Sequence, residues 1–311
     1  MSVCMNGLWY VRRAFAVIAV IPPAGSISFV VITENNVRDC DAILGVLNLV
    51  KKPIDDVIIL TRSDRVSEIN TADRPWCRVV GISDASIYSL RAQIPTISQN
   101  DWLVVLEEHS LVTIATLDAI RSTIQNQTDI DLIVFLGKNL TSVSPWGWAN
   151  FLHTFALIWA PIDVPPPFSP VTSVIVRRAA LRTDSAFREG EWELLTIPQI
   201  FGRGRIAYSN DIYVDHIRRL TAISCFLINY HNARAGAGIG RGLGRPVRRL
   251  LAEGWNTFYR RPPQLARARA ARWSELPPGT LWRMYMVGLI HLIGTVVGAF
   301  FGPGQSAHKI D

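Results

Sequence analysis

Runs of apolar residues divide the first half of the chain into regular segments. Five short runs are rich in Val, Ile, Leu and Phe, and polar or turn-forming residues bound each one. They are residues 26–33 (SISFVVIT), 56–61 (DVIILT), 77–82 (CRVVGI), 101–106 (DWLVVL) and 131–136 (DLIVFL). Continuous runs of this length are typical of strands that are buried on both faces of a sheet. We therefore predict five buried strands.

Helical patterns lie between these strands. Residues 39–50 place apolar side chains at helical spacing, and Lys51-Lys52-Pro53 ends that segment. Residues 171–177 predict another strand and residues 191–201 another helix. Alternating strands and helices indicate an α/β fold with a mostly parallel sheet, which is a common frame for nucleotide binding. No GxGxxG follows the first strand, which argues against the usual dinucleotide-binding fold.

Composition restricts the class of protein. Of 311 residues, 49% are apolar and 18% are charged, and the mean hydropathy is +0.21. A chain this apolar buries a core, so a disordered or fibrous protein is excluded. Its four cysteines (Cys4, Cys40, Cys77, Cys225) are far apart and form no CxxC pair. This spacing excludes a zinc ribbon or a disulfide scaffold and fits a reducing cytosol.

Charge is concentrated near the C-terminus. Ten arginines and only two glutamates lie between Arg241 and Arg283, although the whole chain carries a net charge of only +7. The segment is interleaved with Trp and Tyr, a composition found at anionic membrane surfaces. We find no nucleic-acid-binding motif and predict no nucleic-acid partner. Just before it, residues 235–244 (AGAGIGRGLG) have the composition of a mobile loop.

The segment 284–301 has no charged residue and is just long enough to be a candidate membrane span. Gly294, Gly298 and Gly302 recur every fourth residue, which lets helices approach closely. Three arrangements stay open: a helix that touches the membrane peripherally, a helix packed on its own domain, and a true span. Residues 1–25 superficially resemble a signal peptide, but we expect an N-terminal arm.

Candidate chemistry first appears at the end of the fourth strand. Glu107 and His109 follow the apolar run and point the same way on an extended chain. Ligands of open α/β sheets bind beyond the carboxyl ends of the strands. One carboxylate and one imidazole at this spacing could hold a divalent metal, although solvated acids at a helix start would show the same pattern. The histidines His153, His231 and His291 are expected to be structural.

Several short motifs in the correct order resemble the family 2 glycosyltransferases, which have the GT-A fold. Residues 28–36 (SFVVITENN) resemble the opening strand of the family, and residues 56–64 (DVIILTRSD) resemble its second strand. Residues 91–109 resemble the stretch from the RN.G motif to the DxD motif. Residues 190–194 (GEWEL) resemble the EDxEL motif, and residues 204–216 resemble a later segment that ends in histidine. The tail resembles those of bacterial members.

The resemblance implies an inverting enzyme that moves a sugar from a nucleotide diphosphate to the hydroxyl of a glycan or lipid-linked acceptor. It divides the chain into an arm (1–25), a GT-A domain (26–235) and a Gly/Arg-rich loop with a membrane-associating helical tail (236–311). The implied residues are Glu191, then Glu193, as catalytic base; Thr33, Glu34, Asn35, Arg62 and Arg91 for the donor; and Glu107, His109 and His216 for Mn²⁺ or Mg²⁺. A carboxylate is needed because the attacking hydroxyl must lose a proton.

Departures from the family motifs leave a second interpretation. Thr61 and Arg62 stand where the family has acids, and the DxD motif is Glu107-x-His109. If no metal binds, Arg203, Arg205 or the arginines of the glycine-rich segment could stabilise the leaving diphosphate. The alternative is a glycosyltransferase-like scaffold without turnover, or a membrane-associated binding subunit. We expect the protein at the cytoplasmic face of the inner membrane, held there by residues 241–301, or alternatively free in the cytoplasm.

Overall fold

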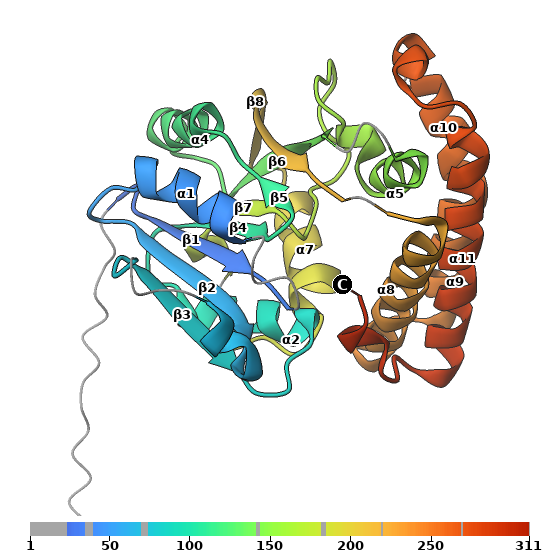
Figure 1. Ribbon diagram of the computed structural model, residues 1–311, viewed down its shortest axis with the longest axis horizontal. Coiled ribbons are helices and arrows are strands. Elements are labelled where there is room, and N and C mark those ends of the chain that lie inside the picture. Colours follow the sequence, from blue (N-terminus) through green and yellow to red (C-terminus); the bar gives the residue numbers. More distant parts are fainter. Residues whose placement is uncertain are drawn as a thin grey trace, which may run out of the picture.

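The computed structural model describes residues 24–34, 40–69, 74–140, 144–181, 185–218, 220–268 and 270–310. Most of the expected N-terminal arm and the donor candidate Asn35 lie outside these ranges. The described part forms an α/β body with a group of long helices on one side (Figure 1). These helices come from the C-terminal third of the chain.

The sheet has eight strands in the order β3-β2-β1-β4-β7-β6-β8-β5. The strands are β1 (Ile27–Ile32), β2 (Asp56–Arg62), β3 (Cys77–Ile82), β4 (Trp102–Glu107), β5 (Ser110–Leu111), β6 (Leu132–Asn139), β7 (Val174–Arg177) and β8 (Ile206–His216). The neighbours β3, β2, β1 and β4 are parallel, as are β6 and β8, whereas β7 runs antiparallel between β4 and β6. The predicted mostly parallel sheet is confirmed, and four of the five strands are buried as predicted. The prediction is wrong for β3, which is only partly buried because it lies at the edge of the sheet.

Helices cover both faces of the sheet. They are α1 (Cys40–Val50), α2 (Ile87–Ala92), α3 (Ile94–Ile97), α4 (Ile114–Asn126), α5 (Pro145–Phe155), α6 (Arg178–Leu181) and α7 (Ile197–Gly202). Side chains of β1 alternate between two cores: Phe29 and Val31 pack with α1 and α4, while Val30 and Ile32 pack with α2 and α5. Burial on both faces explains why the strand reads as an unbroken apolar run.

The C-terminal third is helical. It contains α8 (Ala222–Gly242), α9 (Val247–Trp255), a π-helical turn η5 (Asn256–Arg260), α10 (Arg261–Ala268), a 3-10 segment η6 (Ala270–Glu275) and α11 (Thr280–Phe301). The sequence predicts a mobile loop at 235–244. This prediction is wrong for residues 235–242, because they belong to α8. The boundary expected between 235 and 236 therefore falls inside a helix. Glycine composition suggested a loop, but close packing of α8 requires small residues there.

The contact between α8 and α11 is a close backbone approach. A Cβ atom at Gly298 would collide with the carbonyl oxygen of Arg234, and one at Gly294 would collide with that of Tyr230. The spacing of small residues in α11 thus serves packing within the chain. By length and composition α11 is also the one helix of the described residues that is long and apolar enough to cross a membrane, and 39% of its most apolar window is buried.

Two local predictions are corrected. Residues 191–201 form a π-helical turn η4 (Trp192–Thr196) followed by α7, instead of one regular helix. For Trp146 and Trp148 the sequence predicts a loop with tryptophans that pack or stack on an acceptor sugar, but both residues lie in α5. Trp148 is buried, and Trp146 meets Phe226 of α8 and Trp282 of α11 edge to face. Both tryptophans therefore pack between elements.

Candidate functional site

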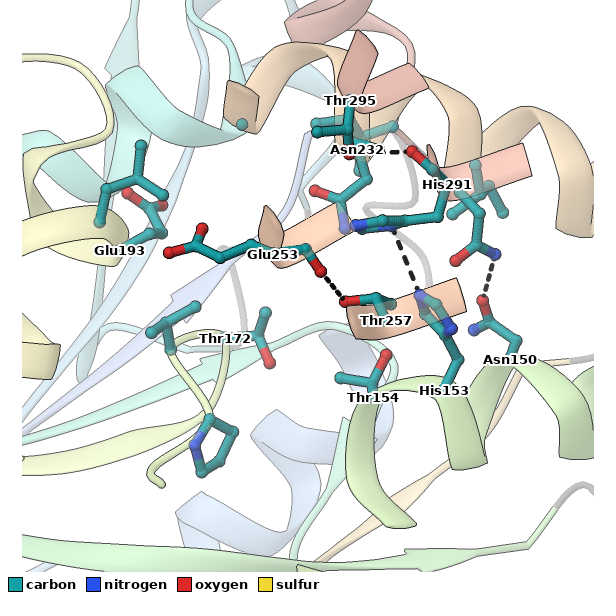
Figure 2. Close-up of a pocket in the computed structure, with 18 of the residues that line it drawn as sticks. Asn150, His153, Thr154, Thr172, Glu193, Asn232, Glu253, Thr257, His291 and Thr295 are labelled. Atoms are coloured by element: carbon teal, nitrogen blue, oxygen red, sulfur yellow. Dashed lines mark hydrogen bonds between the residues drawn. The ribbon is translucent and has the colours of Figure 1, made fainter. Parts of the chain in front are cut away.

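A cavity of about 620 Å³ lies between the α/β body and the C-terminal helices. Its wall includes Glu107 and His109 at the carboxyl end of β4, Glu193 of the turn η4, and residues of α5, α8, α9 and α11. Parallel strands end together at this edge, which is where α/β proteins bind their ligands. Figure 2 shows part of the wall, with polar side chains that converge from both sides.

Arg91 connects two acids of this wall. Its guanidinium donates a 2.8 Å hydrogen bond from Nη1 to Oε1 of Glu193, and its Nη2 binds Glu107. All three side chains are buried. Burial alone would lower the pKa of Arg91, but the two carboxylates raise it above its ordinary value. Arg91 is therefore a permanent cation that orients both acids.

Glu193 has the properties of a poised base. Its Oε2 atom is buried and has no hydrogen-bond partner among the described residues. Burial raises the pKa of Glu193, and Arg91 opposes that rise. A carboxylate that keeps one unused oxygen inside a cavity can accept a proton from a bound hydroxyl.

Glu191 lies elsewhere. It does not line the cavity, and its carboxylate accepts hydrogen bonds from the backbone and side chain of Arg188, at 3.0 and 3.4 Å. Glu191 precedes the turn η4 and Glu193 lies within it, and the two side chains have different partners. The geometry therefore favours Glu193 over Glu191 as the base.

Glu107, His109 and His216 lie close together at the carboxyl end of β4. Nε2 of His109 lies 3.3 Å from Oε2 of Glu107, and the rings of His109 and His216 are 4.9 Å apart. Burial first, then His109 and Arg218, lower the pKa of His216, so its imidazole is neutral. The other oxygen of Glu107 is bound by Arg91. The described residues contain no group of three His, Cys, Asp or Glu side chains that could hold a metal ion, so this set does not fit one as arranged.

Three of the expected donor residues lie at the carboxyl ends of the neighbouring strands β1 and β2. Thr33 and Glu34 are buried after β1, and Arg62 ends β2. Arg62 binds both oxygens of Asp64, and this hydrogen bonding, followed by the charge of Asp64, raises its pKa against the effect of burial. Of the described donor candidates, only Arg91 lines the cavity itself.

Arg203 and Arg205, which were predicted to stabilise the leaving diphosphate if no metal binds, lie away from the edge of the sheet where Glu107 lies. Arg205 binds Asp131, which precedes β6. Because β4 and β6 run in the same direction, this position is at the opposite edge of the sheet from Glu107. Arg203 donates to the backbone of Ala180 and does not line the cavity. Neither arginine is placed to meet a leaving group beside Glu193.

The far wall of the cavity, which α5, α8, the α9 region and α11 form, was missed by the sequence analysis. Its polar residues are Asn150, His153 and Thr154 of α5; Asn229 and Asn232 of α8; Glu253 and Thr257 of the α9 region; and His291 and Thr295 of α11. The only signal was that His291 interrupts an apolar run. Nε2 of His153 lies 3.4 Å from Nδ1 of His291, which joins α5 to α11. Burial, with a smaller contribution from Arg261, lowers the pKa of His291 to about 4.

No protein-family model and no curated protein matches this sequence. Among solved structures, the chain is similar to the mannosyltransferase PcManGT from Pyrobaculum calidifontis, which was determined with GDP-Man and Mn²⁺. The TM-score is 0.54 at 12% identity, over 88% of this chain and 87% of that one. The likeness covers most of the chain and shows the fold: a GT-A-like glycosyltransferase fold.

Two further structures are less similar. TarS 1-349 from S. aureus gives a TM-score of 0.44 at 15% identity, over 85% of this chain and 90% of that one. Glucosyl-3-phosphoglycerate synthase from Mycobacterium tuberculosis gives 0.43 at 14% identity, over 63% and 73%. The fold assignment rests on the first structure alone.

Proposed function

We propose that this protein is a glycosyltransferase that moves a sugar from a nucleotide diphosphate to an acceptor hydroxyl and inverts the anomeric centre. The observation that carries the proposal is Glu193, a buried carboxylate with one unpaired oxygen, held by Arg91 at the wall of a large cavity. The GT-A-like fold and the motif resemblance support the same activity. PcManGT, which shares the fold, was determined with a nucleotide sugar.

In the proposed reaction the donor lies at the ends of β1, β2 and β4, near Thr33, Glu34 and Arg62. The acceptor occupies the cavity, with its hydroxyl at Oε2 of Glu193. A bond forms between the acceptor oxygen and the anomeric carbon, while the bond from that carbon to the phosphate breaks. The hydroxyl proton passes to Glu193, and the nucleoside diphosphate leaves with the electron pair. Arg91 keeps Glu193 oriented and ionised before the proton arrives.

A matched pair of variants tests this assignment. Nucleotide-sugar turnover should first be found with UDP-, GDP-, dTDP- and CDP-sugars, with and without Mn²⁺ or Mg²⁺. Glu193→Gln should then reduce kcat by roughly a hundredfold or more, since a general base contributes about 10²–10⁴-fold. Glu191→Gln should keep near-native turnover. The Kd for the nucleotide should change little in both variants.

The opposite result is equally informative. Loss of turnover in Glu191→Gln alone would give the base role to Glu191 and contradict the geometric argument. Because the base must be ionised, the rate of the native enzyme should fall as pH drops through the raised pKa of Glu193.

Nucleotide binding without turnover of any sugar would favour a second candidate, a scaffold without catalysis. The Arg91–Glu107 ion pair favours that alternative, because it occupies the carboxylate expected to bind a metal.

We also propose that the protein attaches peripherally to an anionic membrane at the cytoplasmic face, through residues 241–301. Trp282, Met286, Ile293 and Phe300 are exposed and recur at intervals that place them on one face of α11. The ten arginines of residues 241–283 supply the charge complementary to anionic lipid. An apolar face flanked by Arg and aromatic residues is typical of helices that lie in the membrane interface.

A further inference from the structure

One corner of the cavity is basic, and no carboxylate of the described residues forms an ion pair with its side chains. Arg261, His153 and His291 all line the cavity, and they come from α10, α5 and α11. Nη1 of Arg261 donates to the carbonyl oxygen of His153, and the two imidazoles lie within 3.4 Å of each other. Three segments that are distant in sequence therefore converge at this corner.

Arg261 differs from Arg91 and Arg245, two other arginines of the cavity, in the partners of its guanidinium. Arg91 pairs with Glu107 and Glu193, and Arg245 pairs with Glu253. Arg261 pairs with no carboxylate in the part of the chain that the structure describes; its one hydrogen bond goes to a neutral carbonyl. Burial lowers its pKa, and no acid offsets this effect. Arg261 is half-buried, and a charge removed from water without a counter-charge is costly, so an anionic ligand would complete the electrostatics of the corner.

The two histidines add donors to the same place. His153 is 6% exposed, and burial, then His291 and Arg261, lower its pKa well below the ordinary value. Nε2 of His153 lies 3.4 Å from Nδ1 of His291, so the two neutral rings share one N–H between them and keep one N–H for a ligand. An anion could accept hydrogen bonds from that ring N–H and from the guanidinium of Arg261. The hydroxyls of Thr154 and Thr257 lie on the same wall (Figure 2). Several donors around one point match the oxygens of a phosphate group better than a neutral sugar.

We propose that the acceptor carries a phosphate group and that Arg261, His153 and His291 bind it. This inference rests on the proposed function, because it places the phosphate on the acceptor of that reaction. In Figure 2 the histidines lie on the side of the view away from Glu193. A phosphate held at this corner would leave the remainder of the acceptor to extend along the cavity toward the base.

Binding can be tested without turnover. We would titrate the full-length protein with sn-glycerol 3-phosphate by isothermal calorimetry, with glycerol as the neutral comparison. The ester should bind and glycerol should not. Arg261→Gln should weaken binding of the ester at least tenfold. The matched control is Arg260→Gln, which removes the same charge from the neighbouring exposed residue outside the cavity and should change the Kd less than twofold.

A second variant protects the test against misfolding. His291→Gln keeps a polar side chain at the corner and should also weaken binding of glycerol 3-phosphate. Melting temperatures of all variants should be recorded alongside. Equal losses in Arg260→Gln and Arg261→Gln, or unchanged binding in both cavity variants, would overturn the proposal. Absence of binding by glycerol 3-phosphate and by every other phosphate probe would overturn it too.

The titration should be repeated with saturating UDP or GDP, whichever binds. Independent binding of nucleotide and ester supports two separate phosphate sites, whereas mutual exclusion would assign the corner to the donor diphosphate and overturn the proposal. If no nucleotide binds but the ester does so through Arg261, the proposed function fails while the phosphate site stands.

Decyl phosphate distinguishes the source of the phosphate. Arg261-dependent binding at least tenfold tighter than that of the glycerol ester indicates a lipid acceptor, and equal binding indicates a soluble one.

Discussion

Glu191 and Glu193 are separated by a single residue, yet only Glu193 faces the cavity and contacts Arg91. Glu191 is bound instead by Arg188 on the outside of the same turn. Residues two apart in a helical turn lie on different faces, so the turn that begins at Trp192 gives the two side chains different surroundings. Trp192 itself is fully buried and donates from its indole to the carbonyl oxygen of Val171, which anchors the turn.

Removal of Arg91 should destabilise the fold. Arg91→Met would leave Glu107 and Glu193 buried without their cation, and breaking a buried ion pair by removing one partner costs about 3–5 kcal/mol. Urea denaturation should show this loss in the free energy of unfolding. Arg65→Met is the control, because Arg65 forms only a surface pair with Glu68 and should have a far smaller effect. Similar losses in both variants would contradict the central role of the Arg91 pairs.

Stability should fall in acid through His291. In the folded protein its pKa is lowered to about 4, while the unfolded chain takes up the proton near pH 6.5. Stability is therefore lost as pH falls from about 6.5 to 4, by about 1.4 kcal/mol per pH unit for each such histidine. His291 faces His153 and Arg261, and Arg261 adds to burial in disfavouring its protonation. His291→Gln should reduce the slope, measured in phosphate-free buffer. An unchanged slope would show that His291 contributes nothing to it.

The contact between α8 and α11 should not tolerate a methyl group. Gly298→Ala places a Cβ against the carbonyl oxygen of Arg234, so we expect a loss of about 1–3 kcal/mol from overpacking. Gly45→Ala is the matched control, because Gly45 lies in α1 with open space around the added atom. It should be neutral or stabilising, since alanine favours a helix. Chemical denaturation of the two variants measures the free energy of unfolding. An unchanged value for Gly298→Ala would mean that the helices do not approach this closely.

Membrane attachment should depend on the exposed face of α11. The native protein should float with vesicles that contain phosphatidylglycerol, and less so as salt rises, because the arginines contribute electrostatically. Ile293→Ser combined with Phe300→Ser should reduce flotation severalfold. Leu49→Ser is the control, since Leu49 is equally apolar and exposed but lies on α1. No flotation of the native protein, or equal losses in the control, would refute attachment through α11.

The sequence by itself determined the core of the α/β body. A strand buried on both faces must be apolar throughout, so β1, β2 and β4 were recognisable from local composition. The position of Glu107 at the end of β4 followed from the same pattern. The ordered motifs also pointed to the GT-A-like fold, through their resemblance to a known family.

Only the tertiary structure decided the C-terminal helices and the far wall of the cavity. The glycine-rich part of α8 has low intrinsic helix propensity, and packing against α11 overrides it. His153 and His291 are far apart in the sequence, so no local pattern could pair them. The choice between Glu193 and Glu191 depended on side-chain direction in an irregular turn. Local sequence specifies which faces are apolar, but the partners of a polar side chain are set by which distant segments the fold brings to it.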